Sequence, residues 1–162
     1  MNKKGFTLIE LLIVVAIIGI VAAIAVPNLL TALQKGKQKS TVGDMKTIGS
    51  CLEDYITDYY MAPGAGNVQN SNQLELYLEP FYVKIMPTTD SWGTLYEYTS
   101  NAGGEYTGTT AQELYTLHSY GRNQISDTVN TTWNGYIVST MDGFNNDIMF
   151  SNGQFSYGPR VN

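Results

Sequence analysis

Hydrophobic residues are most concentrated near the start of the chain. From Phe6 to Val26 there are 21 residues, and only Thr7 and Glu10 among them are polar. At about 1.5 Å rise per residue, a helix of this length reaches roughly 30 Å, which is the thickness of the hydrocarbon core of a bilayer. The pattern predicts a membrane-spanning helix, which we assign to residues 6–34.

A second hydrophobic pattern follows a lysine-rich stretch. Its members recur at spacings of three and four, as on one face of an amphipathic helix. They are Val42, Met45, Ile48, Leu52, Tyr55, Ile56 and Tyr59. Gly36, Gly43 and Gly49 each weaken a helix by about 1 kcal/mol relative to alanine, so packing against a sheet must stabilise this segment. We expect the first helix to continue to about residue 61, before Ala62-Pro63-Gly64.

The clearest strand pattern lies near the C-terminus. Ile148–Ser151 and Gln154–Tyr157 are separated by Asn152-Gly153, a dipeptide that is typical of two-residue hairpin turns. This register places Phe150 opposite Phe155, and Ile148 opposite Tyr157, on one buried face.

Shorter patterns lie between these two regions. Asn72 with Glu75 is typical of a helix start, and Pro80 should end that helix. Strands are expected at Leu95–Tyr98 and Glu113–Tyr120. The sequence therefore predicts an α+β fold. In it, the second half of a long N-terminal helix packs on a small C-terminal antiparallel sheet, within a globular domain of residues 35–162.

Charge divides the chain into two parts. Residues 1–40 carry a net charge of +4, the remainder carries −9, and together they give the net charge of −5. Nucleic acid is excluded as an expected partner of the acidic part, because phosphate binding requires clustered lysine and arginine.

Patterns that indicate catalysis are absent from the sequence. We find no paired carboxylates in a catalytic context, no zinc-ligand spacing, no phosphate loop and no nucleophile elbow, so we expect no enzyme. His118, the single histidine, is expected to have a structural or exposed role on a strand. Cys51, the single cysteine, cannot form an intrachain disulfide and is expected to be a small, partly buried residue.

The N-terminal region has two general explanations. A secretory signal peptide would be cut after Ala23-Ile24-Ala25, and a plain anchor would hold a periplasmic domain. Neither explains Glu10, because an ionised side chain within hydrocarbon costs a few kcal/mol. Glu10 therefore indicates a specific use.

The segment Lys3-Lys4-Gly5-Phe6-Thr7-Leu8-Ile9-Glu10 resembles the prepilin N-terminus of type IV pilins and type II secretion pseudopilins. The resemblance implies that residues 1–5 are a leader, and that a prepilin peptidase cuts between Gly5 and Phe6 and methylates the new Phe6 amine. Residues 6–34 would then form a filament core, in which Glu10 pairs with the Phe6 amine of a neighbouring subunit.

Gly19 and Pro27 interrupt the expected span. Proline removes an N–H donor and its ring clashes with the carbonyl four residues earlier, so the segment from Gly19 to Pro27 should be a weak part of the helix. A tolerated transmembrane kink is one interpretation. The resemblance implies another, in which this segment loses helical structure when the subunit enters the filament.

Two further segments resemble the major pseudopilins of type II secretion. They are Pro87-x-x-Asp90-x-Trp92-Gly93, in which we expect Trp92 to anchor a turn in the core, and Ser119-Tyr120-Gly121. The family binds calcium in the loop that follows the second segment, which makes Asn123, Asp142 and Asp147 candidate ligands, since calcium prefers several oxygen ligands. A polar turn that caps a strand explains the same residues without a metal, and no other cofactor is expected.

The resemblance implies a subunit of a helical filament, most specifically the major pseudopilin of a type II secretion system. Its partners would be copies of itself, minor pilin-like subunits, the prepilin peptidase, an inner-membrane assembly platform with a cytoplasmic ATPase, and membrane lipid before assembly. The chain would cross the bacterial inner membrane once, with its N-terminus cytoplasmic and its C-terminal domain periplasmic. The alternatives are a type IV pilus subunit for adhesion or motility, and an anchored periplasmic binding domain that does not polymerise.

Overall fold

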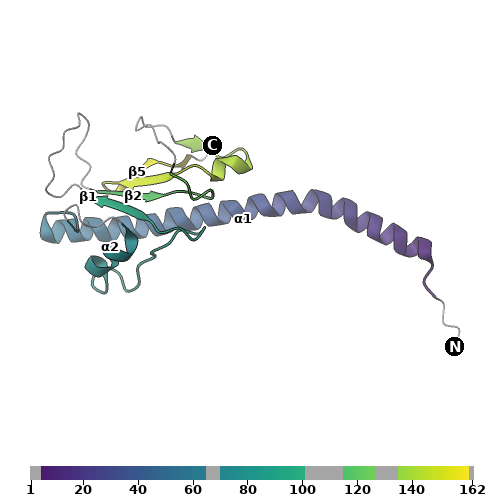
Figure 1. Ribbon diagram of the computed structural model, residues 1–162, viewed down its shortest axis with the longest axis horizontal. Helices are drawn as coiled ribbons and strands as arrows, with labels where there is room; N and C mark the ends of the chain where they lie inside the picture. Colours follow the sequence, from purple (N-terminus) through teal and green to yellow (C-terminus); the bar gives the residue numbers. More distant parts are fainter. Residues whose placement is uncertain (1–4, 65–69, 101–114, 127–134, 161–162) are drawn as a thin grey trace. The chain divides into compact units, whose positions relative to one another are not determined.

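A computed structural model describes residues 5–64, 70–100, 115–126 and 135–160. Its first element is the helix α1 (Leu8–Tyr59), which contains Pro27 (Figure 1). The chain divides into two compact units, residues 1–35 and residues 36–162. The long helix predicted from the sequence is therefore confirmed, and it ends at Tyr59 rather than at about residue 61.

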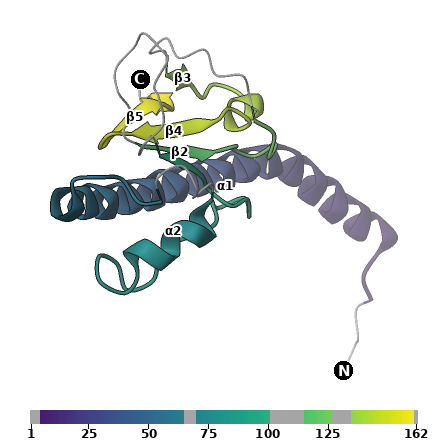
Figure 2. The same cartoon turned by 60° about the vertical axis from the view of Figure 1, so that its left-hand side comes forward.

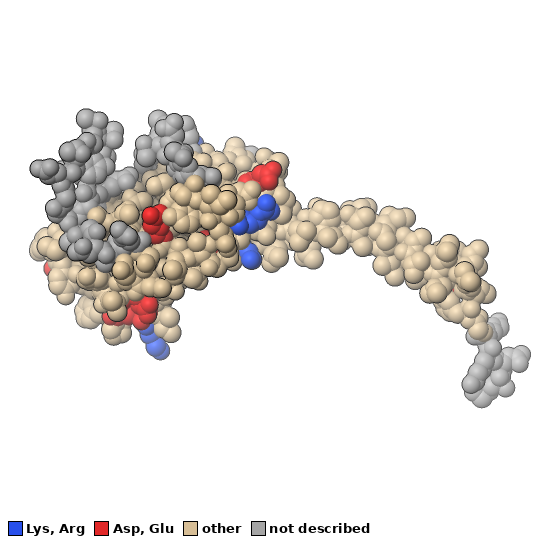
Figure 3. Space-filling view, in the orientation of Figure 1, with Lys and Arg blue, Asp and Glu red and all other residues tan. Residues whose placement is uncertain are grey.

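The first unit is the apolar part of α1. Its large hydrophobic side chains, from Leu8 to Leu33, are exposed. On the face shown in Figure 3, this part of the helix carries no charged atoms. Among the described residues, α1 is the helix that is long and apolar enough to span a membrane.

The helix remains continuous through Pro27. Side chains bond to carbonyls on either side of the proline: Asn28 donates to the Ile24 carbonyl at 3.2 Å, and Thr31 donates to the Pro27 carbonyl at 3.0 Å. Neither bond reaches the Ala23 carbonyl, which is the group that loses its helical donor because Pro27 has no N–H. The isolated subunit is thus helical here, and the loss of helix on assembly stays a prediction.

The second unit combines residues 36–59 of α1 with a short helix and two small sheets (Figure 2). After α1 come α2 (Ser71–Leu78), β1 (Glu97–Ser100), β2 (Tyr115–Ser119), β3 (Tyr136–Ile137), the 3-10 helix η1 (Met141–Phe144), β4 (Ile148–Ser151), β5 (Gln154–Tyr157) and β6 (Pro159–Arg160). The antiparallel sheet has the order β1-β2-β4-β5, and β3 pairs with β6 in parallel. Both ribbon views place the antiparallel sheet on one side of this part of α1 and α2 on the other. The predicted α+β architecture is confirmed.

The core of this unit lies between α1 and the antiparallel sheet. Met45, Ile48 and Leu52 of α1 are buried, as the hydrophobic spacing predicted. Gly49 is buried among them, and a Cβ atom added at this position would lie 2.1 Å from Cε1 of the Phe150 ring. This glycine therefore allows the close approach of β4 to the helix.

The predicted C-terminal hairpin is present, but half of its predicted register is wrong. Phe150 pairs with Phe155, as expected, and the two rings meet edge to face with centroids 4.9 Å apart. Tyr157, however, lies opposite Met149 and not Ile148, because the register shifts between Met149 and Phe150. A bulge of this kind adds one residue to one strand, which hydrophobic alternation does not reveal.

Two predicted element starts are also corrected. The side chain that caps α2 belongs to Asn70, not Asn72, and its Oδ1 accepts a hydrogen bond from the Gln73 amide at 3.2 Å. Asn70 is extended and bridges to Glu97 of β1, which sets the position of the helix start. The strand predicted from Leu95 begins at Glu97, because Leu95 forms an isolated bridge with Thr89 instead.

The turn before β1 is anchored by Asp90, so the prediction that Trp92 is the core anchor is wrong. Asp90 is 4% exposed, whereas Trp92 is half-buried. The Oδ1 atom of Asp90 accepts hydrogen bonds from the amides of Trp92 and Thr94 at 3.0 and 2.9 Å. Its Oδ2 atom accepts one from the hydroxyl of Ser119 at 2.8 Å. These three donors satisfy the hydrogen bonding of the buried Asp90 carboxylate. Asp90 therefore holds the place in the core that was expected for Trp92.

Candidate functional site

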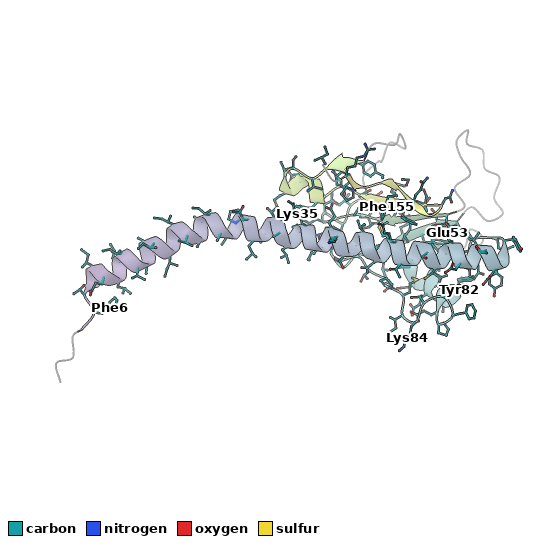
Figure 4. The ribbon with its side chains drawn as sticks, turned by 180° about the vertical axis from the view of Figure 1, so that it is seen from behind. Phe6, Lys35, Glu53, Tyr82, Lys84 and Phe155 are labelled. Carbon is teal, nitrogen blue, oxygen red and sulfur yellow. The ribbon has the colours of Figure 1, made fainter. Side chains whose placement is uncertain are left out.

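The predicted processing site lies just before α1. Gly5, Phe6 and Thr7 are not helical, Gly5 is exposed and the Phe6 side chain is 75% exposed (Figure 4). The peptide bond between Gly5 and Phe6 is therefore accessible and lies outside helical hydrogen bonding. This is the local geometry that a peptidase requires, and the cleavage itself stays a prediction.

Thr7 and Glu10 form a capping box at the start of α1. The Thr7 amide donates to Oε2 of Glu10 at 2.8 Å, and the Glu10 amide donates to Oγ1 of Thr7 at 3.3 Å. The Thr7 hydroxyl donates to the same Oε2 atom at 2.6 Å. Reciprocal bonds of this type satisfy two of the amides that a helix start leaves without partners.

The capping box gives Glu10 a role that our sequence reasoning did not assign. The Thr-x-x-Glu spacing at the beginning of an apolar run was a readable signal for it. The carboxylate is exposed in the single chain, and both bonds that reach it end on Oε2. Thr7 thus holds Glu10 four positions from Phe6, whose amine would become the new N-terminus after cleavage.

His118 lies at the centre of a polar cluster that sequence analysis did not find. Its Nε2 atom lies 2.9 Å from Oδ2 of the fully buried Asp147, and its Nδ1 atom lies 3.4 Å from Oε2 of Glu97. The hydroxyl of Tyr120 donates to the same Oε2 atom of Glu97. Burial, and then the bond to the Glu97 carboxylate, raise the pKa of the Tyr120 hydroxyl. The cluster joins β1, β2 and the residue before β4, which agrees with a structural role for His118.

The three candidate calcium ligands have different surroundings. Asn123 uses its Oδ1 atom to accept a hydrogen bond from the Ile125 amide at 3.1 Å. Asp142 is exposed at the start of η1, whereas Asp147 is fully buried against His118. Within the described part of the chain, no three His, Cys, Asp and Glu side chains are grouped closely enough to hold a metal ion.

Hydrogen bonds and close backbone contacts join the segment that follows β2 to residues 144–146. The Arg122 amide donates to the Phe144 carbonyl at 2.8 Å, and Nε of Arg122 donates to Oδ1 of Asn145 at 2.9 Å. Gly121 has a φ of +65°, and a Cβ atom there would lie 2.7 Å from the Asn146 carbonyl oxygen. As arranged, the described residues do not form a calcium site, because Oδ1 of Asn123 and Oδ2 of Asp147 already face protein nitrogens and no three candidate ligands are grouped. Calcium binding stays a prediction without support from this geometry.

Cys51 is buried on the face of α1 that meets the domain core, as predicted. Its Sγ atom lies 3.5 Å from the Tyr82 carbonyl oxygen. Burial, and then the nearby Asp54 carboxylate, raise the pKa of the thiol. A buried thiol with a raised pKa is a poor nucleophile, so Cys51 is a packing residue.

Known proteins are similar to this chain both in its N-terminal motif and over most of its length. A family model for the prokaryotic N-terminal methylation motif matches residues 1–26. The chain is 32% identical over 139 residues to a type II secretion system core protein G of Pseudomonas aeruginosa. The aligned region covers 78% of this chain and 90% of that protein. It is 34% identical over 106 residues to the protein of the same name from Vibrio cholerae, covering 61% and 72% of the two chains. The corresponding protein of Escherichia coli is 30% identical over 103 residues, covering 59% and 70%. No solved structure matches the chain significantly.

Proposed function

Because this chain belongs to the family of type II secretion system core protein G, we propose that it is the major subunit of a pseudopilus, a helical filament built from many copies of the chain. One observation carries the proposal: an exposed apolar helix begins with a Thr7–Glu10 capping box beside an accessible Gly5–Phe6 bond. The role is structural rather than catalytic.

Processing would come first. A prepilin peptidase cuts between Gly5 and Phe6 and methylates the Phe6 amine, leaving residues 6–162. The match of residues 1–26 to the N-terminal methylation motif supports this step. Cleavage removes Lys3 and Lys4 and creates one positive charge at Phe6, four positions before the Glu10 carboxylate.

Assembly would follow from the exposed apolar helix. In the membrane, lipid covers the hydrophobic side chains between Leu8 and Leu33. In a filament, the same side chains of neighbouring copies cover one another. A carboxylate buried in that packing requires a partner, since an unpaired buried charge is costly. The Phe6 amine of a neighbouring copy supplies a positive charge at the correct end of the helix.

The remaining features of the proposal concern the cell. The chain crosses the inner membrane once, with the leader in the cytoplasm and residues 35–162 in the periplasm. An assembly platform driven by a cytoplasmic ATPase lifts processed subunits into the filament, which also contains minor pilin-like subunits. Similarity to core protein G favours secretion over a type IV pilus or an anchored domain that does not polymerise.

A complementation experiment tests this function. The chain is expressed in a bacterium whose own core protein G gene has been deleted from a working type II secretion system. We expect sheared filaments that contain the chain, together with secretion of the host's substrate proteins. A chain that remains in the membrane fraction as single copies, with the peptidase and platform present, would contradict the proposal.

A further inference from the structure

Helix α1 carries two pairs of like charges on its solvent-exposed surface. Lys35 and Lys39 form the first pair and Asp54 and Asp58 form the second, and all four side chains are exposed. Members of each pair are four positions apart, so they lie one turn apart on the same face of the helix. Figure 4 shows the stretch of α1 concerned, with Lys35 and Glu53 labelled.

Two other charged residues of α1, Lys46 and Glu53, have partners within the chain. The amine of Lys46 lies 5.8 Å from the centre of the Phe155 ring, and Glu53 accepts a hydrogen bond from the Tyr115 hydroxyl at 2.8 Å. The ion pairs among the described residues are those of His118, so neither charge pair has an ion-pair partner within that part of the chain. Asp58 accepts a hydrogen bond from the Tyr82 hydroxyl at 2.8 Å, which orients its carboxylate without cancelling its charge.

The two pairs are matched in spacing as well as in sign. Asp54 follows Lys35 by 19 positions, and Asp58 follows Lys39 by the same number. In a helix this offset corresponds to about 28 Å along the axis and about 5.3 turns. An axial shift of this distance between two parallel copies of α1 therefore brings both lysines of one copy level with both aspartates of the other, and the position of one copy around the other decides whether they face each other.

We propose that Lys35 and Lys39 of one copy contact Asp54 and Asp58 of a neighbouring copy, and that this contact sets the axial shift between parallel α1 helices. The inference rests on the proposed function, and it names the self-association surface that the filament uses. All copies enter the membrane in the same orientation, so their helices are parallel.

The geometry makes this contact open-ended. Because 19 positions are about 5.3 turns, the lysine pair and the aspartate pair face directions about a quarter of a turn apart. Each copy therefore uses two different faces for two different neighbours. A contact between unlike surfaces does not close on itself as a two-fold dimer does, and it generates rings or helical filaments.

Cross-linking tests the contact directly. Lys39→Cys and Asp58→Cys are combined in one chain with Cys51→Ala, and filaments are treated with a short bis-maleimide reagent. The two new thiols of one chain are about 28 Å apart on one helix, so the reagent links only different copies. We expect a ladder of dimers, trimers and larger species.

Two matched variants control the cross-linking. Asp58→Cys alone should give single chains, and dimers would indicate a two-fold contact instead. Lys39→Cys with Ser50→Cys, which is also exposed, has the wrong offset and should give no ladder. A ladder from this second variant, or none from the pair with the correct offset, would overturn the proposal.

Charge reversal gives an independent answer. Lys35→Glu with Lys39→Glu should abolish most filament, as should Asp54→Lys with Asp58→Lys, while all four changes together should restore it. Lys84→Glu reverses another exposed lysine and should leave filaments at the wild-type amount. The lysine reversal could abolish filaments while the fourfold variant does not recover them. In that case the lysines bind lipid headgroups and the proposal is wrong. Wild-type chains that form no filament at all would instead contradict the proposed function.

Discussion

The Asp90 carboxylate accepts a hydrogen bond of 2.8 Å from the Ser119 hydroxyl, which joins two segments that are 29 positions apart in the sequence. Both groups are buried, with exposures of 4% and 1%. The two segments are those that resemble major pseudopilins, Pro87 to Gly93 and Ser119 to Gly121. Their distinctive residues therefore act as one unit, in which the turn before β1 is fastened to the end of β2.

Removing this bond should destabilise the domain. Ser119→Ala leaves the buried Asp90 carboxylate with one donor fewer, and we expect a loss of about 1–3 kcal/mol in the free energy of unfolding. Denaturant unfolding of the detergent-solubilised chain measures this. Ser40→Ala, at an exposed position on α1, is the matched control and should change stability little. Equal effects of the two substitutions would contradict a role for the bond.

Two glycines of α1 should respond in opposite directions to the same substitution. A Cβ atom at Gly49 would overlap the Phe150 ring, whereas nothing lies within 4 Å of one at Gly43. Gly49→Ala should therefore destabilise the domain by about 1–3 kcal/mol, as overpacking usually does. Gly43→Ala should stabilise it by up to about 1 kcal/mol, because alanine favours the helix. Thermal melting of both variants distinguishes a packing requirement from helix propensity alone, which predicts stabilisation at both positions.

Local patterns in the sequence predicted those parts of the fold that local physics determines. The apolar run from Phe6 predicted the helix, and Asn152-Gly153 predicted the hairpin turn, because each depends on neighbouring residues alone. The Thr7–Glu10 capping box was equally local, and its spacing could have been read from the sequence.

The features that were missed depend on contacts between distant segments. Asp90 bonds to two local amides, but its second oxygen is bonded only because Ser119 reaches it, and Asn70 bridges to Glu97 of β1 where it caps α2. His118 and Asp147 are 29 positions apart, and no spacing rule connects them.

Calcium removal tests the corner that follows β2. Arg122 and His118 already occupy acceptors in this corner, so we expect the melting temperature of the purified full chain to be the same with calcium and with chelator. A ligand that binds only the folded state would raise the melting temperature. A clear fall on chelation would contradict this expectation.

Substitutions of Glu10 separate its two roles. Glutamine at this position can still complete a capping box, although it carries no charge. Alanine provides neither the capping group nor the charge. We expect Glu10→Gln and Glu10→Ala to be inserted and cleaved normally and to enter filaments equally poorly, because a buried Phe6 amine would lack its counter-charge. Thr7→Ala removes the cap but keeps the charge, and it should still assemble. Comparison of membrane-bound with sheared protein measures assembly, and wild-type amounts of Glu10→Gln filament would show that the charge is not required.

The most direct test of the account is the intact mass of the chain recovered from sheared filaments. Filaments are prepared from cells that contain the prepilin peptidase and the assembly platform, and the subunit is dissociated and weighed by mass spectrometry. The account predicts a filament subunit that consists of residues 6–162, with one methyl group on the Phe6 amine. A subunit that begins at Met1 or at Val26, or a sheared fraction without this chain, would contradict it.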